Sequence, residues 1–360
     1  MNYIYISLII ANICFNQSLL DRLVVPVYID SEFSYGYDDN YLKLSMPEQQ
    51  DELVNRLGDS SQIDSKIIKN KINFLYMPYL FHSHDTKFNF SVSSSKYSSS
   101  SLKSYNNYFL KVSQHLAPYT WIKFSYSYTP LFYIKSYSQS DPYISYSIED
   151  SNYMPSLFTS EKVAAELTAP VPYFYKTYFS IKYLFESQYF NPDFNEFDLE
   201  ISSYYFKIRK KIFNKLNISI AYMNSTAENI SFENGLLSTS DKDRSYIQDK
   251  LYVSFSINKF YFLGGKTSSG IYTSYESREF SSVLDNDKLH FMRSHDDLII
   301  NYWIKRHVSN SFDFKIKGVH RERNTNSPYN TEGTTVGEFK SFQKFEIWLS
   351  IILKMELNVY

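Results

Sequence analysis

The feature that most constrains this chain is an alternation of apolar and polar residues, which recurs in long segments from residue 31 onward. In the last segment, one parity carries Phe345, Ile347, Leu349, Ile351, Leu353, Met355, Leu357 and Val359. The other parity is mostly polar, with Trp348 and Ile352 as exceptions. Because successive side chains of a strand point to opposite faces, a period of two predicts β-strands. Such segments exceed the usual strand length of about five or six residues.

About fourteen segments follow this pattern, and together they make up most of the chain. Large aromatic residues favour strands, and the chain has 35 Tyr and 29 Phe. The segments are residues 31–46, 66–79, 86–97, 104–116, 119–137, 158–169, 173–188, 195–210, 216–226, 245–258, 260–278, 290–306, 311–323 and 341–360. The sequence therefore predicts an all-β fold.

The connections between these segments alternate in length, as a trend with exceptions. Residues 117–118 and 170–172 are short connections. Residues 47–65 and 138–157 are long and polar. In a membrane-spanning barrel one rim carries short turns and the other carries longer loops. The sequence therefore predicts a single antiparallel transmembrane β-barrel over residues 31–360, with short periplasmic turns and long external loops.

A closed sheet also fits the distribution of apolar residues. Lipid requires every backbone polar group to be paired within the protein, and a closed sheet has no unpaired edge. Beyond residue 20 there is no run of about 18 apolar residues, so a helical membrane protein is excluded. A secreted, soluble all-β protein is the alternative, because a half-buried sheet gives the same alternation. Strand length, the loop trend and the apolar last strand favour the barrel.

The first residues have the character of an export signal. Residues 3–15 form an apolar stretch that is too short to cross a membrane as a helix, although no Lys or Arg precedes Arg22. We therefore expect a signal peptide at residues 1–18 and a periplasmic lead segment at residues 19–30. A buried N-terminal strand is the alternative. The single cysteine, Cys14, lies in the signal, which excludes disulfides and cysteine metal sites from the mature chain.

Two short motifs resemble those of bacterial outer-membrane proteins. The residues FSYGYDDN at 33–40 are similar to the GYDSN-like first strand of many outer-membrane barrel domains, among them those of surface-lipoprotein assembly modifiers. The final strand and its terminal Tyr360 resemble the C-terminal signal that the barrel-assembly machinery reads. The resemblance implies a porin-like barrel in the outer membrane of a Gram-negative bacterium, with both termini in the periplasm. The helical repeats that usually precede the barrel in those modifiers are absent from this sequence.

The polar parity would line the lumen of such a barrel. Rings of charged side chains set ion selectivity in pores, but both signs occur here, so strong selectivity is not predicted. A barrel of about fourteen strands exceeds the eight or so that side chains alone can fill, which favours an open channel over a salt-bridged plug or a solvated face. The expected pore-lining residues are Lys123, Lys176, Lys182, Glu196, Asp198, Glu200, Asp297, Lys305, Lys315, Lys317, Lys344 and Glu346.

The sequence therefore predicts a porin-like channel that passes small hydrophilic solutes, with no catalytic residue, cofactor or metal. Its expected partners are outer-membrane lipid and lipopolysaccharide, the barrel-assembly machinery, the solutes and further copies of the chain. A net charge of −1 argues against nucleic acid. One alternative is a barrel that exports or assembles a polysaccharide or a surface protein. Another is a barrel-embedded lipid hydrolase that uses Ser294 and His295.

The densest histidine group is the pair His82 and His84, which Asp85 follows. Two histidines at alternate positions of a strand would face the same way and could share a metal ion. This group falls in a short connection between predicted strands. Solvated turn residues are therefore the preferred interpretation.

Overall fold

Fourteen long strands form the body of the protein in a computed structural model. It describes residues 22–50, 57–60, 62–81, 84–138, 153–213, 215–233, 242–262, 264–285, 287–328, 330–331 and 334–358. The long strands are β1 (Val27–Asp38), β2 (Ser65–Tyr76), β3 (Thr86–Tyr97), β4 (Tyr105–Ala117), β5 (Thr120–Ser138), β6 (Tyr153–Pro170), β7 (Thr177–Phe190), β8 (Leu199–Ile212), β9 (Leu216–Asn229), β10 (Tyr246–Phe262), β11 (Gly265–Phe280), β12 (Ser294–His307), β13 (Phe312–Asn326) and β16 (Phe342–Leu357).

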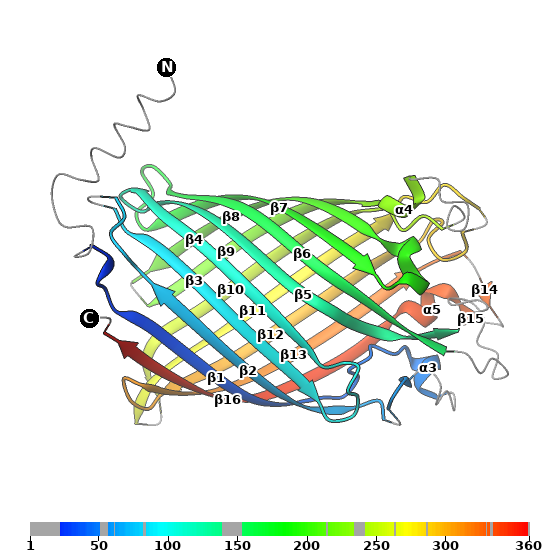
Figure 1. The fold of residues 1–360 in the computed structure, drawn as a ribbon, viewed down its shortest axis with the longest axis horizontal. Helices are drawn as coiled ribbons and strands as arrows, with labels where there is room; N and C mark the ends of the chain where they lie inside the picture. Colours follow the sequence, from blue (N-terminus) through cyan, green and yellow to red (C-terminus); the bar gives the residue numbers. More distant parts are fainter. Residues whose placement is uncertain are drawn as a thin grey trace, which may run out of the picture.

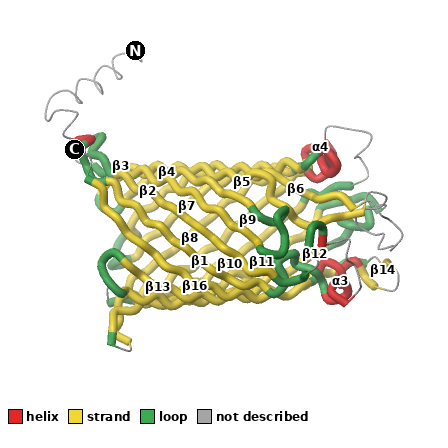
Figure 2. The backbone as a smooth tube through the Cα atoms, turned by 60° about the horizontal axis from the view of Figure 1, so that its bottom comes forward, coloured by secondary structure: helices red, strands yellow, loops and turns green. Residues whose placement is uncertain are grey.

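The connections carry short elements only. They are α3 (Met46–Gln50), η2 (Pro192–Phe197), α4 (Ile230–Glu233), β14 (Asn330–Thr331), β15 (Thr334–Thr335) and α5 (Val336–Lys340). In the part of the chain that the structure describes, no helix is long and apolar enough to cross a membrane. The helices therefore belong to the connections and add no second layer to the sheet (Figure 2).

The long strands close into a barrel (Figure 1). Each long strand pairs antiparallel with the next long strand of the chain, β13 with β16 included, and β1 pairs with both β2 and β16. At the closing seam the ladder runs from Val27 opposite Leu357 to Asp38 opposite Glu346. The fold predicted from the sequence, a single antiparallel β-barrel, is confirmed, and the strands number fourteen.

The two ends of the barrel differ, as the loop lengths predict. β1 begins and β16 ends at one end, which also carries short turns such as residues 118–119 and 171–176 (Figure 1). We refer to it as the turn end. The helices α3, α4 and α5 lie at the opposite end, the loop end, with the long connections (Figure 1). This arrangement is typical of membrane-spanning barrels.

The first strand begins earlier than predicted. β1 starts at Val27, where it pairs with Leu357 on one side and Tyr76 on the other. The prediction that residues 19–30 form a lead segment is therefore wrong from Val27 onward. Backbone pairing on both sides extends the strand, which the side-chain pattern alone did not indicate. The predicted signal peptide, residues 1–18, lies outside the described residues.

The first strand also ends earlier than predicted, at Asp38 instead of near residue 46. The side chain of Asn40 folds the chain back at this point. Its oxygen accepts a hydrogen bond from the Leu44 amide (2.7 Å), and its amide group donates one to the Leu44 carbonyl (2.8 Å). Lys43 takes the left-handed conformation, with φ 57°. Such local side-chain bonds compete with strand pairing and start turns.

The two faces of the sheet follow the predicted parity. In β16, Ile347, Leu349 and Ile351 are exposed on the outside, while Ser350 is buried inside. Exposed large apolar side chains continue this belt around the barrel, for example at Phe124, Val163, Ile208, Ile220, Leu251 and Tyr302. A closed sheet with an apolar outer belt is suited to a lipid surrounding.

Trp348 is an exception to the polar inner parity, and Gly36 explains it. The two residues lie opposite each other in the ladder between β1 and β16. A Cβ atom at Gly36 would lie only 2.5 Å from the Trp348 ring. The missing side chain therefore lets the indole lie against the inner wall at the closing seam, where its Nε1 donates a hydrogen bond to Glu346 (2.9 Å).

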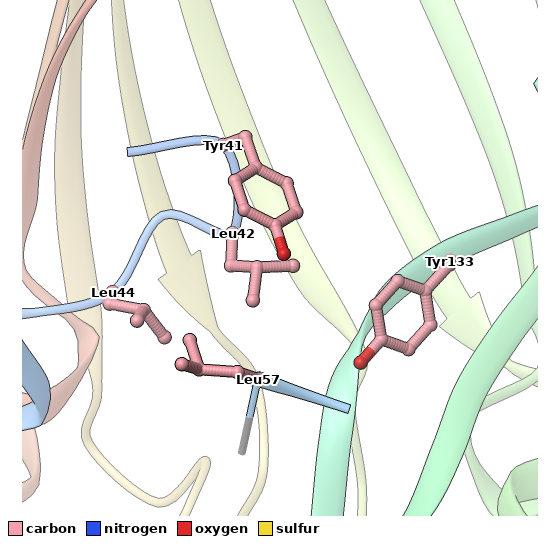
Figure 3. Packing of buried hydrophobic residues seen from close by; sticks show 5 residues of the cluster. All are labelled: Tyr41, Leu42, Leu44, Leu57 and Tyr133. Atoms are coloured by element: carbon pink, nitrogen blue, oxygen red, sulfur yellow. The ribbon is translucent and has the colours of Figure 1, made fainter. Parts of the chain in front are cut away.

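The connection between β1 and β2 folds over the inner wall at the loop end. Tyr41, Leu42, Leu44 and Leu57 of this connection pack against Tyr133 of β5 in a buried apolar cluster (Figure 3). Full burial of such a side chain stabilises a fold by about 1.5–3 kcal/mol. The cluster therefore holds the connection in a fixed position beside the lumen.

Candidate functional site

The inner face of the barrel carries most of the residues that the sequence predicts to line a pore. They lie on the parity opposite to the exposed apolar belt. They are Lys123, Lys182, Asp297, Lys305, Lys315, Lys317, Lys344 and Glu346. Several pair with residues of other strands. Lys344 of β16 pairs with Asp38 of the adjacent β1 (2.6 Å), and Lys315 of β13 reaches Glu32 of β1 across β16 (2.9 Å). That they line an open pore stays a prediction.

Three of the predicted residues lie away from the inner wall. Glu196 belongs to η2, and Asp198 follows it, where its carboxylate accepts a hydrogen bond from the Phe190 amide (2.6 Å). Glu200 shares the parity of Tyr204, which is exposed on the outer face. The predicted assignment of Glu196, Asp198 and Glu200 to the pore wall is corrected accordingly.

The physical reason is an apolar cluster inside the loop end of the barrel. Leu199, Ile201, Ala227, Tyr246 and Phe280 are buried together on the inner parity of their strands. The connections at the loop end cover these residues, so apolar side chains point inward there and outward in the lipid belt. The sequence prediction placed the apolar parity outside along the whole strand.

The fourth residue, Lys176, lies in the turn between β6 and β7 and not on a strand. Its backbone takes the left-handed conformation, with φ 53°, and its Nζ lies 4.7 Å from the centre of the Tyr175 ring. The predicted strand started at residue 173, whereas β7 begins at Thr177. Lys176 therefore belongs to the rim of the turn end.

A cavity of about 620 Å³ opens in the lumen toward the turn end, lined by residues from β2 to β9. All of its charged lining residues are cations: Lys87, Lys111, Lys123, Arg209 and Lys211. Two of them stack on aromatic rings, with the Lys87 Nζ 4.5 Å from the Trp121 ring and the Arg209 guanidinium 5.2 Å from the Tyr178 ring. This part of the lumen therefore has a positive electrostatic potential.

A cavity of about 700 Å³ lies farther toward the loop end, between β2–β7 and β13. Its cations are Lys43, Lys69, Lys162 and Arg321. Lys43 comes from the β1–β2 connection, and burial, followed by the charge of Arg321, holds its pKa well below the usual value. The one acidic lining residue, Glu186, accepts hydrogen bonds from Ser160 and pairs with Lys162 (2.8 Å).

A smaller cavity of about 190 Å³ lies at the loop end. We refer to it as the arginine pocket, because its lining includes Arg244, Arg278, Arg293 and Arg323. Residues of β5–β7 form one side and residues of β11–β13 the other, so the pocket spans the interior of the barrel. Lys340, His290, His295, Ser156 and Tyr137 add to its polar lining, which contains no carboxylate.

The acidic groups near these cavities are paired within the wall. Glu166 lies 2.7 Å from Lys123. Glu276 lies 3.0 Å from Arg278 and 3.1 Å from Lys250. Although the chain as a whole carries a net charge of −1, the surface that faces the lumen cavities is positive.

The sequence prediction missed several of these cations. Arg323 falls on a predicted strand at the polar parity, so the periodicity was a usable signal for it. Arg209 shares the parity of Leu199, which the sequence predicted to face outward, and the segment that contains Arg278 shows no clean alternation. Lys43 and Arg293 lie in connections, although the sequence placed both on strands. Nothing in the alternation of residues describes how a connection folds into a lumen.

The other candidate sites do not assemble as catalytic or metal centres. Ser294 and His295 are adjacent on β12 and point to opposite faces, with His295 buried inside, so they cannot act as a nucleophile and base pair. His84 packs against the His115 ring, 5.4 Å between centroids, and His82 lies outside the described residues. Across the residues that the structure describes, no three His, Cys, Asp or Glu side chains gather closely enough to hold a metal ion.

His290 makes the loop end sensitive to pH. Burial lowers its pKa to about 4, even though Asp287 lies 3.0 Å from its Nδ1. In an unfolded chain, histidine titrates near about pH 6.5. The connection between β11 and β12 therefore binds a proton at His290 more readily when it is locally unfolded than when it is folded. The stability of the folded connection is therefore highest above about pH 6.5 and falls as the pH is lowered toward 4.

Hydrogen exchange of residues 287–293 checks this expectation. Relative to the intrinsic rate, exchange should accelerate as pH falls from about 6.5 to 4. His290→Asn, which does not titrate in this range, should abolish the acceleration. Equal protection of the parent protein across the range would contradict the expectation.

An even number of antiparallel strands, an exposed apolar belt, a polar lumen and short turns at one end now describe the molecule. This is the architecture of an outer-membrane β-barrel. Comparison with protein families gives no match, and comparison with curated proteins gives none either.

Among solved structures, the chain is similar in shape to several barrels. OmpT, an outer membrane protein of Vibrio cholerae, is 8% identical with a TM-score of 0.43, covering 95% of this chain and 99% of that one. OprD of Pseudomonas aeruginosa is 6% identical with a TM-score of 0.41, covering 92% and 95%. CdiB from Acinetobacter baumannii is 10% identical with a TM-score of 0.45, covering 91% and 60%. Likenesses this distant assign neither a family nor a function.

Proposed function

We propose that the protein is a porin-like channel that passes small hydrophilic solutes across a bacterial outer membrane, with the turn end in the periplasm. The observation that carries this proposal is the series of polar cavities along the lumen, of about 620, 700 and 190 Å³. A barrel of this size has more interior than its side chains fill. The exposed apolar belt supports the membrane setting.

The alternation of inner and outer residues offers a matched test in β3. Ser93 lines the middle cavity, and Ser94, its neighbour, has the parity of the exposed Phe90. Each is replaced by cysteine in a Cys14→Ser background, and single-channel conductance is recorded in a planar bilayer. Because Cys14 is the only natural cysteine, the thiol reagent then has one target.

The parent protein should give stable conductance steps. A charged methanethiosulfonate reagent should lower the conductance of Ser93→Cys, since the added group occupies the lumen, and should leave Ser94→Cys unchanged. Folded, membrane-extracted protein without conductance would contradict the proposal. Secretion of a polysaccharide or surface protein that depends on the chain, or lipid hydrolysis by the purified protein, would then identify one of the two alternative functions.

A further inference from the structure

The arginine pocket holds two buried polar nitrogen atoms that no group in the described part of the protein contacts by a hydrogen bond. Nε of Arg293 and Nε2 of His295 are both buried without a hydrogen-bond partner. His295 is 5% exposed, and its Nε2 lies 3.8 Å from the Glu276 carboxylate, which is too far for a hydrogen bond. A buried guanidinium N–H without an acceptor is unfavourable, so Nε of Arg293 points to a missing acceptor.

Two of the guanidinium groups are held in place by stacking and by hydrogen bonds. Arg278 lies 3.9 Å from the Tyr246 ring and donates to Gln248 (2.7 Å). Arg293 lies 3.8 Å from the Phe280 ring. A guanidinium that is fixed by its face still presents donors along its edge, in the fork that matches a carboxylate or a phosphate.

The lining of the pocket is cationic, although two of its arginines pair with carboxylates behind the lining: Arg278 with Glu276 (3.0 Å) and Arg323 with Asp297 (2.8 Å). The repulsion that these charges leave acts on Arg293. Burial, and next the charges of Arg244, Arg323 and Arg278, lower the pKa of Arg293 to about 9. A bound anion would offset this repulsion and accept the unsatisfied hydrogen bonds.

We propose that the arginine pocket binds a small oxyanion, a carboxylate or a phosphate, that enters the lumen from the loop end. The pocket volume of about 190 Å³ is below the roughly 300–1,000 Å³ of pockets for drug-sized ligands, so the ligand is small. The role of the oxyanion as a transported solute rests on the proposed channel function. The binding of the oxyanion to the pocket is independent of that function.

The cavities below the pocket continue the same preference. The middle cavity carries four cations and one acid that is already paired, and the cavity at the turn end carries five cations and no acid. An anion that leaves the pocket therefore meets positive side chains as far as the turn end. A cation would meet repulsion at each level.

Equilibrium binding tests the pocket without any assumption about transport. The folded full chain in detergent at low salt is titrated by calorimetry with inorganic phosphate and, separately, with succinate. Arg293→Gln should weaken binding about ten- to hundred-fold, as expected for hydrogen bonds to a charged group. Arg293→Lys should weaken it less, because the charge stays and only the fork is lost.

Two further variants complete the test: the first is a control, and the second removes another guanidinium of the pocket. Lys96→Gln removes a positive charge from the outer parity of β3 near the loop end, and it should leave binding unchanged. Arg323→Gln removes a second pocket guanidinium while Arg321 still pairs with Asp297. It should weaken binding as Arg293→Gln does, and it replaces that variant should Arg293→Gln fail to fold.

The outcomes separate the two proposals. Binding of phosphate, succinate or both supports the pocket and identifies the oxyanion. No binding of either by folded protein, or binding that neither arginine variant weakens, overturns it even if the channel conducts. In a KCl gradient, a reversal potential shifted toward the equilibrium potential of chloride supports a role in the transport of anions. A reversal potential shifted toward that of potassium overturns this role. Binding without conductance upholds the pocket and contradicts the proposed channel.

Discussion

Replacing Asp297 by alanine should destabilise the barrel by about 3–5 kcal/mol, the cost of breaking a buried ion pair by removing one partner. Asp297 is 1% exposed and accepts hydrogen bonds from Arg321 (2.9 Å) and Arg323 (2.8 Å). Without the carboxylate, two guanidinium groups on neighbouring β13 positions face each other with no counter-charge. The free energy of unfolding in denaturant, measured in lipid vesicles, checks the expectation.

The matched control for this variant is the adjacent residue on the same strand. Asp296 precedes Asp297 on β12 and points to the other face of the sheet. Asp296→Ala should cost about 1 kcal/mol or less, as expected for substitutions away from buried networks. A loss below about 1 kcal/mol for Asp297→Ala as well would mean that the two arginines find other partners or solvent.

Replacing Ile351 by arginine should destabilise the barrel in a membrane by about 2–4 kcal/mol. Ile351 is exposed on the outer face in the middle of the apolar positions of β16, opposite Phe33 and Phe314. A charged group near the middle of the lipid layer loses its hydration without gaining a partner. Unfolding in denaturant from vesicles, compared with the parent protein, gives the difference.

Ser350 provides the control for Ile351. It is the preceding residue, lies on the inner face and is hydrogen-bonded to the Ser34 hydroxyl (2.8 Å). Ser350→Ala should cost about 0.5–1.5 kcal/mol, the net contribution of one hydrogen bond. Equal losses for the two variants would show that the outer face of β16 does not contact lipid.

Local patterns in the chain were enough to predict most of the barrel. The period of two placed β3 at residues 86–97, as observed, and set the inner and outer faces of β16. These features depend on neighbours in sequence, because side-chain direction alternates along any strand. The beginning of β1 at Val27 was missed, since it depends on pairing with Leu357 and Tyr76, far away in the chain.

The candidate site was predictable only in part. Eight of the expected lining residues lie on the inner face. Glu200 does not, because at the loop end of β8 the apolar residues Leu199 and Ile201 face inward and are buried. Lys43 and Arg293 reach the lumen through connections that fold inward. The prediction of no strong charge preference followed from counting both signs along the chain, which does not reveal which acids are already paired.

The sequence by itself determined most of the strands, the faces of most of them and the approximate number that close the sheet, because these follow from the local alternation of side chains and from the spacing of turns. The tertiary structure decided the character of the lumen. Pairing of β10 with β11 brought Lys250 against Glu276, and closure of the seam brought Lys344 of β16 against Asp38 of β1. With these acids paired, cations line the cavities. Electrostatic pairing across strands depends on distances that exist only once the strands have paired.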